Sequence, residues 1–286
     1  MLQPVIHTLS FIKFSHSIFA LPFALGAMVA AARGWPSPKI FLLIVAAMVT
    51  ARSAAMAFNR IADAKIDAKN LRTQNRHLPQ GILSKRFAVG LTVIAGGLFL
   101  LICYFINPLA FLLSPFVLIW LLAYSYTKRF TWLTHFWLGI SLGLSPLGAW
   151  IAVTGELPWP ALALGAAVTF WVAGFDIIYA AQDLDFDRRE GIHSLPARFG
   201  IAKALWISRG LHVLSVIFLV LFGIQNSLGI IYFATVVLIG LGLAWEHRLV
   251  RPADLSKVNA AFFNVNGIIS LLFFLGILLE GIAHFQ

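Results

Sequence analysis

The 286-residue chain is 60% hydrophobic and only 11% charged, with a mean hydropathy of +0.89. A composition this apolar excludes a soluble globular protein of the same length. The formal net charge of +10 needs no nucleic-acid partner, because basic loops beside membrane spans and attraction to anionic lipid headgroups account for it. Cys103 is the single cysteine, so neither a disulfide framework nor a cysteine-based metal site is expected.

Apolar windows of about 18 to 22 residues recur along the chain, and each is long enough to cross a hydrocarbon core of about 30 Å. They predict an all-α integral membrane protein with nine transmembrane helices. The expected spans are residues 14–32, 40–58, 87–106, 109–126, 135–153, 161–181, 204–224, 228–245 and 258–279.

The positions of Lys and Arg predict the orientation of these spans. With a cytoplasmic N-terminus, seventeen of the 21 basic residues fall in inner segments and only Arg33 and Lys39 fall in outer ones, while Arg52 and Arg209 lie within spans. This asymmetry places the loops after the even-numbered spans in the cytoplasm.

Acidic residues are rare and clustered: only 11 Asp and Glu occur, and five of them fall in two short stretches. In the first stretch, Asn59, Asp63 and Asp67 are spaced i, i+4, i+8, which on a helix forms one polar stripe at the end of the second span. Arg52 lies two turns earlier on the same face, within an apolar run where an unpaired charge is costly. Because clustered acids repel one another, a cation or a cation-bearing ligand is the expected reason for keeping them together.

The second stretch repeats this pattern at the end of the sixth span. Tyr179, Asp183 and Asp187 have the same i, i+4, i+8 spacing, Asp176 lies one turn further into the span, and Asp185 lies beside the stripe. Both stretches follow even-numbered spans and both lead into basic loops, so we expect two related halves of the chain.

Carboxylates at this spacing can bind Mg²⁺ through oxygen ligands, and Mg²⁺ is usually completed by substrate phosphates rather than by protein alone. Basic side chains after each stretch are expected if a diphosphate lies beside the metal, because Arg binds phosphate bidentately. These residues are Arg72, Arg76, His77 and Lys85 in the first loop and Arg188, Arg189, His193 and Arg198 in the second. A solvated loop is the ordinary explanation of one such motif, but two at matching spacing favour a magnesium–diphosphate site.

Taken together, these motifs resemble the UbiA superfamily of intramembrane prenyltransferases over nearly the whole chain. The resemblance lies in residues 59–67 with the trailing 72–81, in 183–187 with 191–194, and in 124–132, which is similar to the segment after the fourth helix in the 4-hydroxybenzoate polyprenyltransferase branch. It implies one polytopic domain, 1–286, with a UbiA-type bundle around a central cavity and two pseudo-related parts, about 1–130 and 131–286.

The resemblance also implies a reaction. The two Asp-rich motifs bind Mg²⁺ and the diphosphate of a polyprenyl donor, and ionisation leaves an allylic cation that attacks an aromatic ring ortho to its hydroxyl. The implied metal ligands are Asn59, Asp63, Asp67, Asp183 and Asp187, and the four aspartates are also the implied catalytic residues. Arg60 departs from the family pattern, which often has Asp directly after the Asn, although this position is off the coordinating stripe. We expect the active site to face the cytoplasm from the inner (plasma) membrane.

Arg52 is the residue that points to the acceptor, because a buried arginine is a candidate to bind the carboxylate of an aromatic acid. The alternative is that Arg52 forms a structural pair with an acid such as Asp176. Asp176 and Tyr179 are candidates to orient the phenol or to receive its proton. The other candidates for substrate binding are Asn59, Arg72, Arg76, Lys128, Arg129, Asp185 and Arg198. A carboxylated phenol fits best, so 4-hydroxybenzoate is the expected acceptor.

Three alternative functions stay open. A dihydroxynaphthoate of menaquinone synthesis could be the acceptor, and haem farnesylation is an activity of the same superfamily. An ion-coupled transporter is the alternative of a different class, but it predicts acids near the bilayer centre, whereas the acids here cluster at one face.

Two groups of residues are not assigned to the site. The histidines outside the two loops show no paired ligand spacing and are expected to be incidental, among them His135, His212 and His247. Three glycines in the fifth span are expected to permit close helix packing: Gly139, Gly143 and Gly148.

Overall fold

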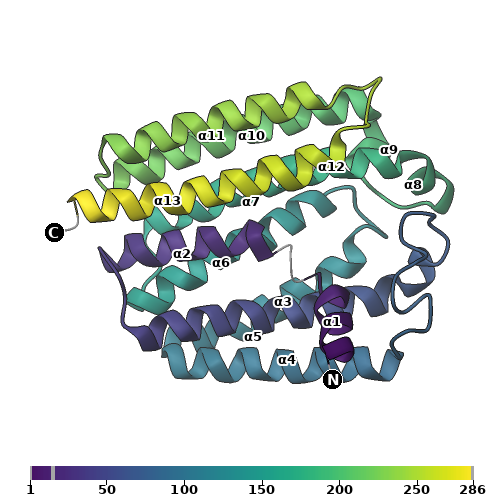
Figure 1. Cartoon of the computed structure of the whole chain (residues 1–286), viewed down its shortest axis with the longest axis horizontal. Coiled ribbons are helices and arrows are strands. Elements are labelled where there is room, and N and C mark those ends of the chain that lie inside the picture. Colours follow the sequence, from purple (N-terminus) through teal and green to yellow (C-terminus); the bar gives the residue numbers. More distant parts are fainter. Residues whose placement is uncertain (1, 14–16, 285–286) are drawn as a thin grey trace. The chain divides into compact units, whose positions relative to one another are not determined.

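The computed structural model describes residues 2–13 and 17–284, whose regular structure is helical apart from an isolated β-bridge between Arg251 and Asp254 (Figure 1). The elements in chain order are α1 (Leu2–Phe11), α2 (Ser17–Ala32), α3 (Pro38–Asp67), α4 (Lys85–Ile106), α5 (Pro108–Thr127), α6 (Thr134–Thr154), α7 (Trp159–Ala180), η2 (Ala181–Asp183), α8 (Leu184–Glu190), α9 (Leu195–Phe199), α10 (Ile201–Gln225), α11 (Ile230–Leu249), α12 (Val258–Ala260), η3 (Ala261–Val265) and α13 (Asn266–His284). The element η2 is a 3₁₀ turn and η3 is a π-helix.

Within the described residues, eight helices are long and apolar enough to cross a membrane, so the chain is a multi-pass membrane protein. These eight coincide with the second to ninth expected spans. The first expected span, 14–32, corresponds to the 16-residue α2, and its residues 14–16 lie outside the described part of the chain. At 1.5 Å per residue α2 is about 24 Å long, shorter than a hydrocarbon core. Eight long helices and one shorter apolar helix therefore stand where nine long crossings were predicted.

The helix α3 is longer than a membrane crossing requires. Its 30 residues extend about 45 Å, whereas about 20 residues cross the hydrocarbon core. Asp63 and Asp67 lie in the last two turns of α3. The extra length therefore carries these acids beyond the apolar part of the helix.

The chain forms two compact units. One consists of Lys39–Tyr126 with the N-terminal segment, and the other consists of Ile18–Pro38 with the chain from Thr127 onward. In the first unit, Phe11 and Ile12 at the end of α1 are buried with Ala57 of α3 and Ala88 of α4. This apolar contact docks α1 onto the helix that carries the first acidic stretch.

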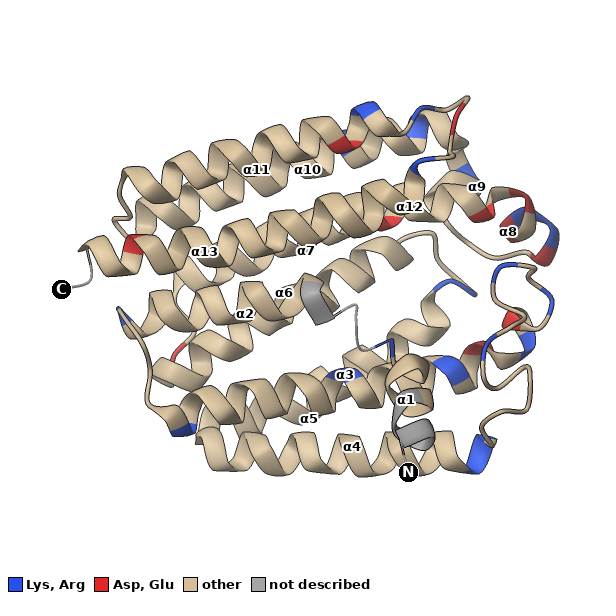
Figure 2. Ribbon diagram, viewed as in Figure 1, with Lys and Arg blue, Asp and Glu red and all other residues tan. Residues whose placement is uncertain are grey.

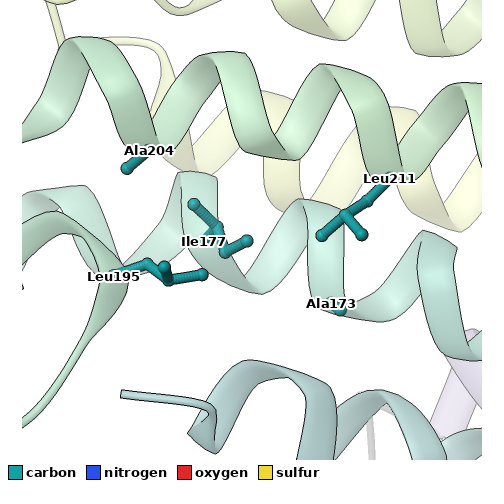
Figure 3. Close-up of a cluster of buried hydrophobic side chains, with 5 residues drawn as sticks. All are labelled: Ala173, Ile177, Leu195, Ala204 and Leu211. Carbon is teal, nitrogen blue, oxygen red and sulfur yellow. The ribbon is translucent and has the colours of Figure 1, made fainter. Parts of the chain in front are cut away.

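The helix α7 is the central helix of the second unit and packs against α6 and α10. On one side, Ala173 and Ile177 of α7 form a buried cluster with Leu195 of α9 and with Ala204 and Leu211 of α10 (Figure 3). Because Leu195 is fully buried in this cluster, the short helix α9 and the loop before it are held against α7.

On its other side, α7 approaches α6 closely at two glycines. A Cβ added to Gly143 would lie 2.6 Å from the carbonyl oxygen of Gly165, and one added to Gly139 would collide with the backbone of Thr169. Gly148, in contrast, has open space where its Cβ would be. The packing role predicted for these glycines is therefore confirmed for Gly139 and Gly143 but wrong for Gly148.

Charged residues lie mostly at helix ends and in loops (Figure 2). In the first unit they gather on the last turns of α3 and in the loop that follows it. In the second unit they gather on α8 and around α9. The long apolar stretches of the helices thus leave each acidic motif at a polar end of its unit.

Candidate active site

The first motif lies on one continuous helix, as its spacing predicts. Asn59 Nδ2 donates a hydrogen bond to Asp63 Oδ2 at 3.2 Å, which places the two side chains on the same face of α3. Asp63 and Asp67 are only 2% and 4% exposed. Their oxygens are therefore held in a largely dehydrated position, where a bound cation would offset the repulsion between them.

Asp67 already has a cationic partner in its own unit. Arg76 Nη1 lies 2.7 Å from both carboxylate oxygens of Asp67, and the hydroxyl of Thr73 donates to the Asp67 carbonyl at the end of α3. Arg72 is exposed, and its backbone N–H donates to Asn70 Oδ1. The loop after α3 is thus folded back so that one of its two predicted diphosphate-binding arginines contacts the acidic motif.

Two arginines of α3 donate to carbonyl groups where α1 ends. Arg60 Nε donates to the carbonyl of Phe11 at 3.2 Å, and Arg52 Nη2 donates to that of Lys13 at 3.0 Å. Carbonyls at a helix C-terminus lack intrahelical partners, so positively charged donors stabilise them. Arg60 therefore has a structural contact at the position where the family often has Asp, and Arg52 has an acceptor within its own unit.

The second motif does not lie on one regular helix. The helix α7 ends at Ala180, the 3₁₀ turn η2 includes Asp183, and α8 begins at Leu184. Because a 3₁₀ turn has about three residues per turn instead of 3.6, the stripe predicted from the i, i+4, i+8 spacing is interrupted. Asp185 is exposed, whereas Asp187 is buried and accepts a hydrogen bond from Ser194 Oγ at 2.8 Å.

Asp176 and Tyr179 lie on α7 just before this break. Asp176 Oδ2 lies 2.7 Å from Nδ1 of the buried His135 in the first turn of α6. The other ring nitrogen of His135, Nε2, accepts the backbone N–H of Leu195 at 3.2 Å. The sequence analysis gave His135 no role and did not foresee this contact, because residues 41 positions apart form no local pattern. Tyr179 packs its ring against Phe262 at 4.2 Å between centroids.

Of the basic candidates in the second unit, Lys128 is connected to this motif by a backbone hydrogen bond. The carbonyl of Lys128 accepts the N–H of His193 at 2.8 Å, which joins the loop before α6 to the loop between α8 and α9. Lys128 is half-buried, while Arg129 and Arg198 are exposed. Lys128 is therefore held at the second motif, whereas Arg129 in its loop and Arg198 on α9 are exposed.

A buried polar network in the second unit was missed by the sequence analysis. Asn266 Nδ2 donates to Glu246 Oε1 at 2.6 Å, and Trp171 Nε1 donates to Asn266 Oδ1 at 2.7 Å. The His212 ring lies between the Trp171 carbonyl and Nε2 of His247, at 3.2 and 2.9 Å. The sequence analysis did not foresee these contacts of the two histidines. The signal available in the sequence was Glu246, an acid directly after the expected span 228–245, which the structure shows to be fully buried.

A model of the UbiA prenyltransferase family matches residues 20–274. The chain belongs to this family. Similar curated proteins named 4-hydroxybenzoate octaprenyltransferase include one from Nitrosomonas eutropha, 35% identical over 87% of each chain, and one from Vibrio campbellii, 31% identical over 88% of each chain.

Solved structures agree with the fold of this UbiA family member. The apo structure of a UbiA homologue from Aeropyrum pernix K1 has a TM-score of 0.84 and 34% sequence identity, covering 93% of this chain and 98% of that one. A homologue from Archaeoglobus fulgidus bound to GPP and Mg²⁺ has a TM-score of 0.78 at 21% identity, covering 97% and 98%. The latter shows that the fold is shared.

The ligand types of the two motifs suit Mg²⁺, since they are carboxylate and amide oxygens. The described residues contain no group of three or more His, Cys, Asp or Glu side chains placed to hold a metal on their own. Mg²⁺ does not require such a group, because it keeps several waters and takes phosphate oxygens as further ligands. The UbiA family motifs of this chain therefore fit a metal that binds together with a diphosphate.

Proposed function

We propose that this UbiA family member transfers a polyprenyl group from a polyprenyl diphosphate to the ring of 4-hydroxybenzoate, a step of ubiquinone biosynthesis. The observation that supports it most directly is the near full-length similarity, at 31 to 35% identity, to proteins named 4-hydroxybenzoate octaprenyltransferase. Octaprenyl diphosphate is accordingly the donor to test first.

We infer that the chain crosses the inner membrane nine times, counting the short α2, with a cytoplasmic N-terminus. The excess of Lys and Arg in alternate loops supports this orientation. Both Asp-rich motifs then reach the cytoplasmic face, where a water-soluble acceptor and a diphosphate headgroup are available. The prenyl chain stays in an apolar environment throughout the reaction.

The proposed metal ligands are Asn59, Asp63, Asp67, Asp183 and Asp187. When bound, Mg²⁺ neutralises charge on the diphosphate and so makes it a better leaving group. The protein supplies the remaining positive charge through Arg72, Arg76, Lys128, Arg129 and Arg198. The contact between Arg76 and Asp67 keeps this guanidinium at the motif, so that it needs little reorganisation to meet a phosphate oxygen.

The reaction breaks the bond between the prenyl carbon and a diphosphate oxygen and forms a carbon–carbon bond ortho to the phenol hydroxyl. The ring proton leaves, aromaticity is restored, and diphosphate is released. Arg52 binds the acceptor carboxylate, Asp176 and Tyr179 orient the phenol or take the proton, and Asp185 contributes to substrate binding. The reaction requires that water be excluded from the site, because water would capture the allylic cation.

The test is turnover by the full chain in membranes containing Mg²⁺, octaprenyl diphosphate and either 4-hydroxybenzoate or a dihydroxynaphthoate, with lipid products identified by mass. Asp63→Asn and Asp183→Asn should abolish the product, while Asp254→Asn, at an exposed loop acid, should leave it unchanged. Prenylated 4-hydroxybenzoate that depends on both motifs supports the proposal. Product only from the dihydroxynaphthoate would reassign the acceptor, and intact diphosphate with every aromatic acid would exclude this function.

A further inference from the structure

Three hydrogen bonds and the peptide bond between Ser194 and Leu195 connect the residues of the second motif. The hydrogen bonds run from Asp176 to His135 at 2.7 Å, from His135 to the N–H of Leu195 at 3.2 Å, and from the adjacent Ser194 to Asp187 at 2.8 Å. These hydrogen bonds join α6, α7, α8 and the start of α9. Nothing in the spacing of these residues along the sequence predicts that they meet.

The direction of each hydrogen bond follows from the donors available. Because the N–H of Leu195 donates to Nε2 of His135, that nitrogen carries no proton and the ring proton is on Nδ1. Nδ1 therefore donates to Asp176. Both ring nitrogens of His135 are thus in use, and the residue is only 2% exposed.

The carboxylates at the two ends of this series of hydrogen bonds, Asp176 and Asp187, are fixed in different ways. At one end, His135 holds Oδ2 of Asp176, while that side chain keeps 18% exposure and can still meet a ligand. At the other end, Ser194 caps α9 by accepting the N–H of Ala197 and donates its own proton to Asp187. The buried Leu195 ties this cap to the apolar cluster around α7.

We propose that His135 is a positioning residue of the second motif, setting Asp176 toward the acceptor through Nδ1 and Asp187 toward the metal and diphosphate through Nε2 and α9. This inference rests on the proposed function. A purely structural His135 would join α6 to α7 with no selective effect on either substrate.

Two substitutions separate the two bonds of His135. The amide nitrogen of Asn stands near Nδ1, so His135→Asn keeps a donor for Asp176 and loses the acceptor for Leu195. The amide oxygen of Gln reaches toward Nε2, so His135→Gln keeps the acceptor and loses the donor. His284→Gln is the control, at an exposed histidine of α13 whose contact is with Glu280, away from the second motif.

We expect His135→Gln to raise KM for 4-hydroxybenzoate by roughly tenfold or more, the loss typical of one hydrogen bond to a charged group, with KM for octaprenyl diphosphate unchanged. His135→Asn should do the reverse. Equal effects of both variants on both substrates, or no effect of either, would overturn the proposal.

Binding without turnover gives a second readout. Mg²⁺ with geranyl thiolodiphosphate should raise the thermal midpoint of the wild-type chain and of His135→Gln, but should raise that of His135→Asn and Ser194→Ala much less. If the two His135 variants do not fold, Ser194→Ala and Asp176→Asn test the two ends of this series of hydrogen bonds separately. A normal response of Ser194→Ala to the ligand would refute the inference. Because this readout needs no acceptor, it still applies if wild-type enzyme fails to prenylate 4-hydroxybenzoate, in which case only the proposed function is lost.

Discussion

Replacing Gly143 with alanine should weaken the packing of α6 on α7. The new Cβ would lie 2.6 Å from the carbonyl oxygen of Gly165, whereas ordinary contact begins near 3.4 Å, so the helices must separate by about 0.8 Å. The Thr169 hydroxyl also lies close to the new Cβ, but the Gly165 carbonyl is backbone, so no rotamer change relieves that clash. Overpacking of this kind costs about 1 to 3 kcal/mol.

The matched control is Gly148→Ala in the same helix, where the added methyl group meets open space. Alanine is favoured over glycine inside a helix by about 1 kcal/mol, and both variants gain this term. The difference between them therefore isolates the packing term.

The assay is thermal unfolding of the purified chain in detergent micelles. Gly143→Ala should have a lower midpoint than wild type, and Gly148→Ala should match or exceed it. Prenyl transfer should also fall in Gly143→Ala, because the hydrogen bond between His135 and Asp176 joins the same two helices. Equal midpoints for the two glycine variants would refute the steric reasoning.

Three further predictions concern other parts of the chain. Asn266→Ala should lower the thermal midpoint, because it removes the hydrogen bond to the fully buried Glu246. Leaving a buried polar group without its hydrogen-bond partner costs about 1 to 3 kcal/mol of stability. An unchanged midpoint would contradict this prediction. Burial first, and then nearby positive charge, lower the pKa of His77 below 6.5. Near and below that pH the folded state binds fewer protons than the unfolded state, so the stability of the protein should fall as pH drops through about 6.5. Thermal midpoints at pH 8 and pH 5.5 would show this fall, which should be smaller in His77→Gln. Arg76→Lys should raise KM for octaprenyl diphosphate about tenfold or more, because Lys lacks the planar guanidinium fork that binds phosphate oxygens bidentately. An unchanged KM would remove Arg76 from the diphosphate site.

Much of the fold and one of the two motifs follow from local sequence patterns. Apolar runs of membrane-spanning length predict the long helices, because in lipid a helix satisfies its own backbone hydrogen bonds. The stripe of Asn59 and Asp63 was equally predictable, since i, i+4 neighbours meet on any regular helix.

The rest depended on contacts between residues distant in sequence. The bond between His135 and Asp176 joins residues 41 positions apart, and that between Trp171 and Asn266 joins residues 95 apart. The 3₁₀ turn that includes Asp183 also contains no Gly or Pro from which it could be predicted. The residues of the second motif have the i, i+4, i+8 spacing in sequence, but the helix break at Asp183 prevents them from forming one stripe. Amino-acid composition does not predict this break.

The bond from Arg60 to the carbonyl of Phe11 has a consequence for how sequences of this family diverge. An acid at position 60 has no proton to donate to the end of α1, and it would place negative charge beside carbonyl groups that already carry partial negative charge. We therefore expect residue 60 and the first helix to covary, with an arginine accompanying an N-terminal helix docked as α1 is here. A comparison of related sequences in which the two change independently would show that the docking has another basis.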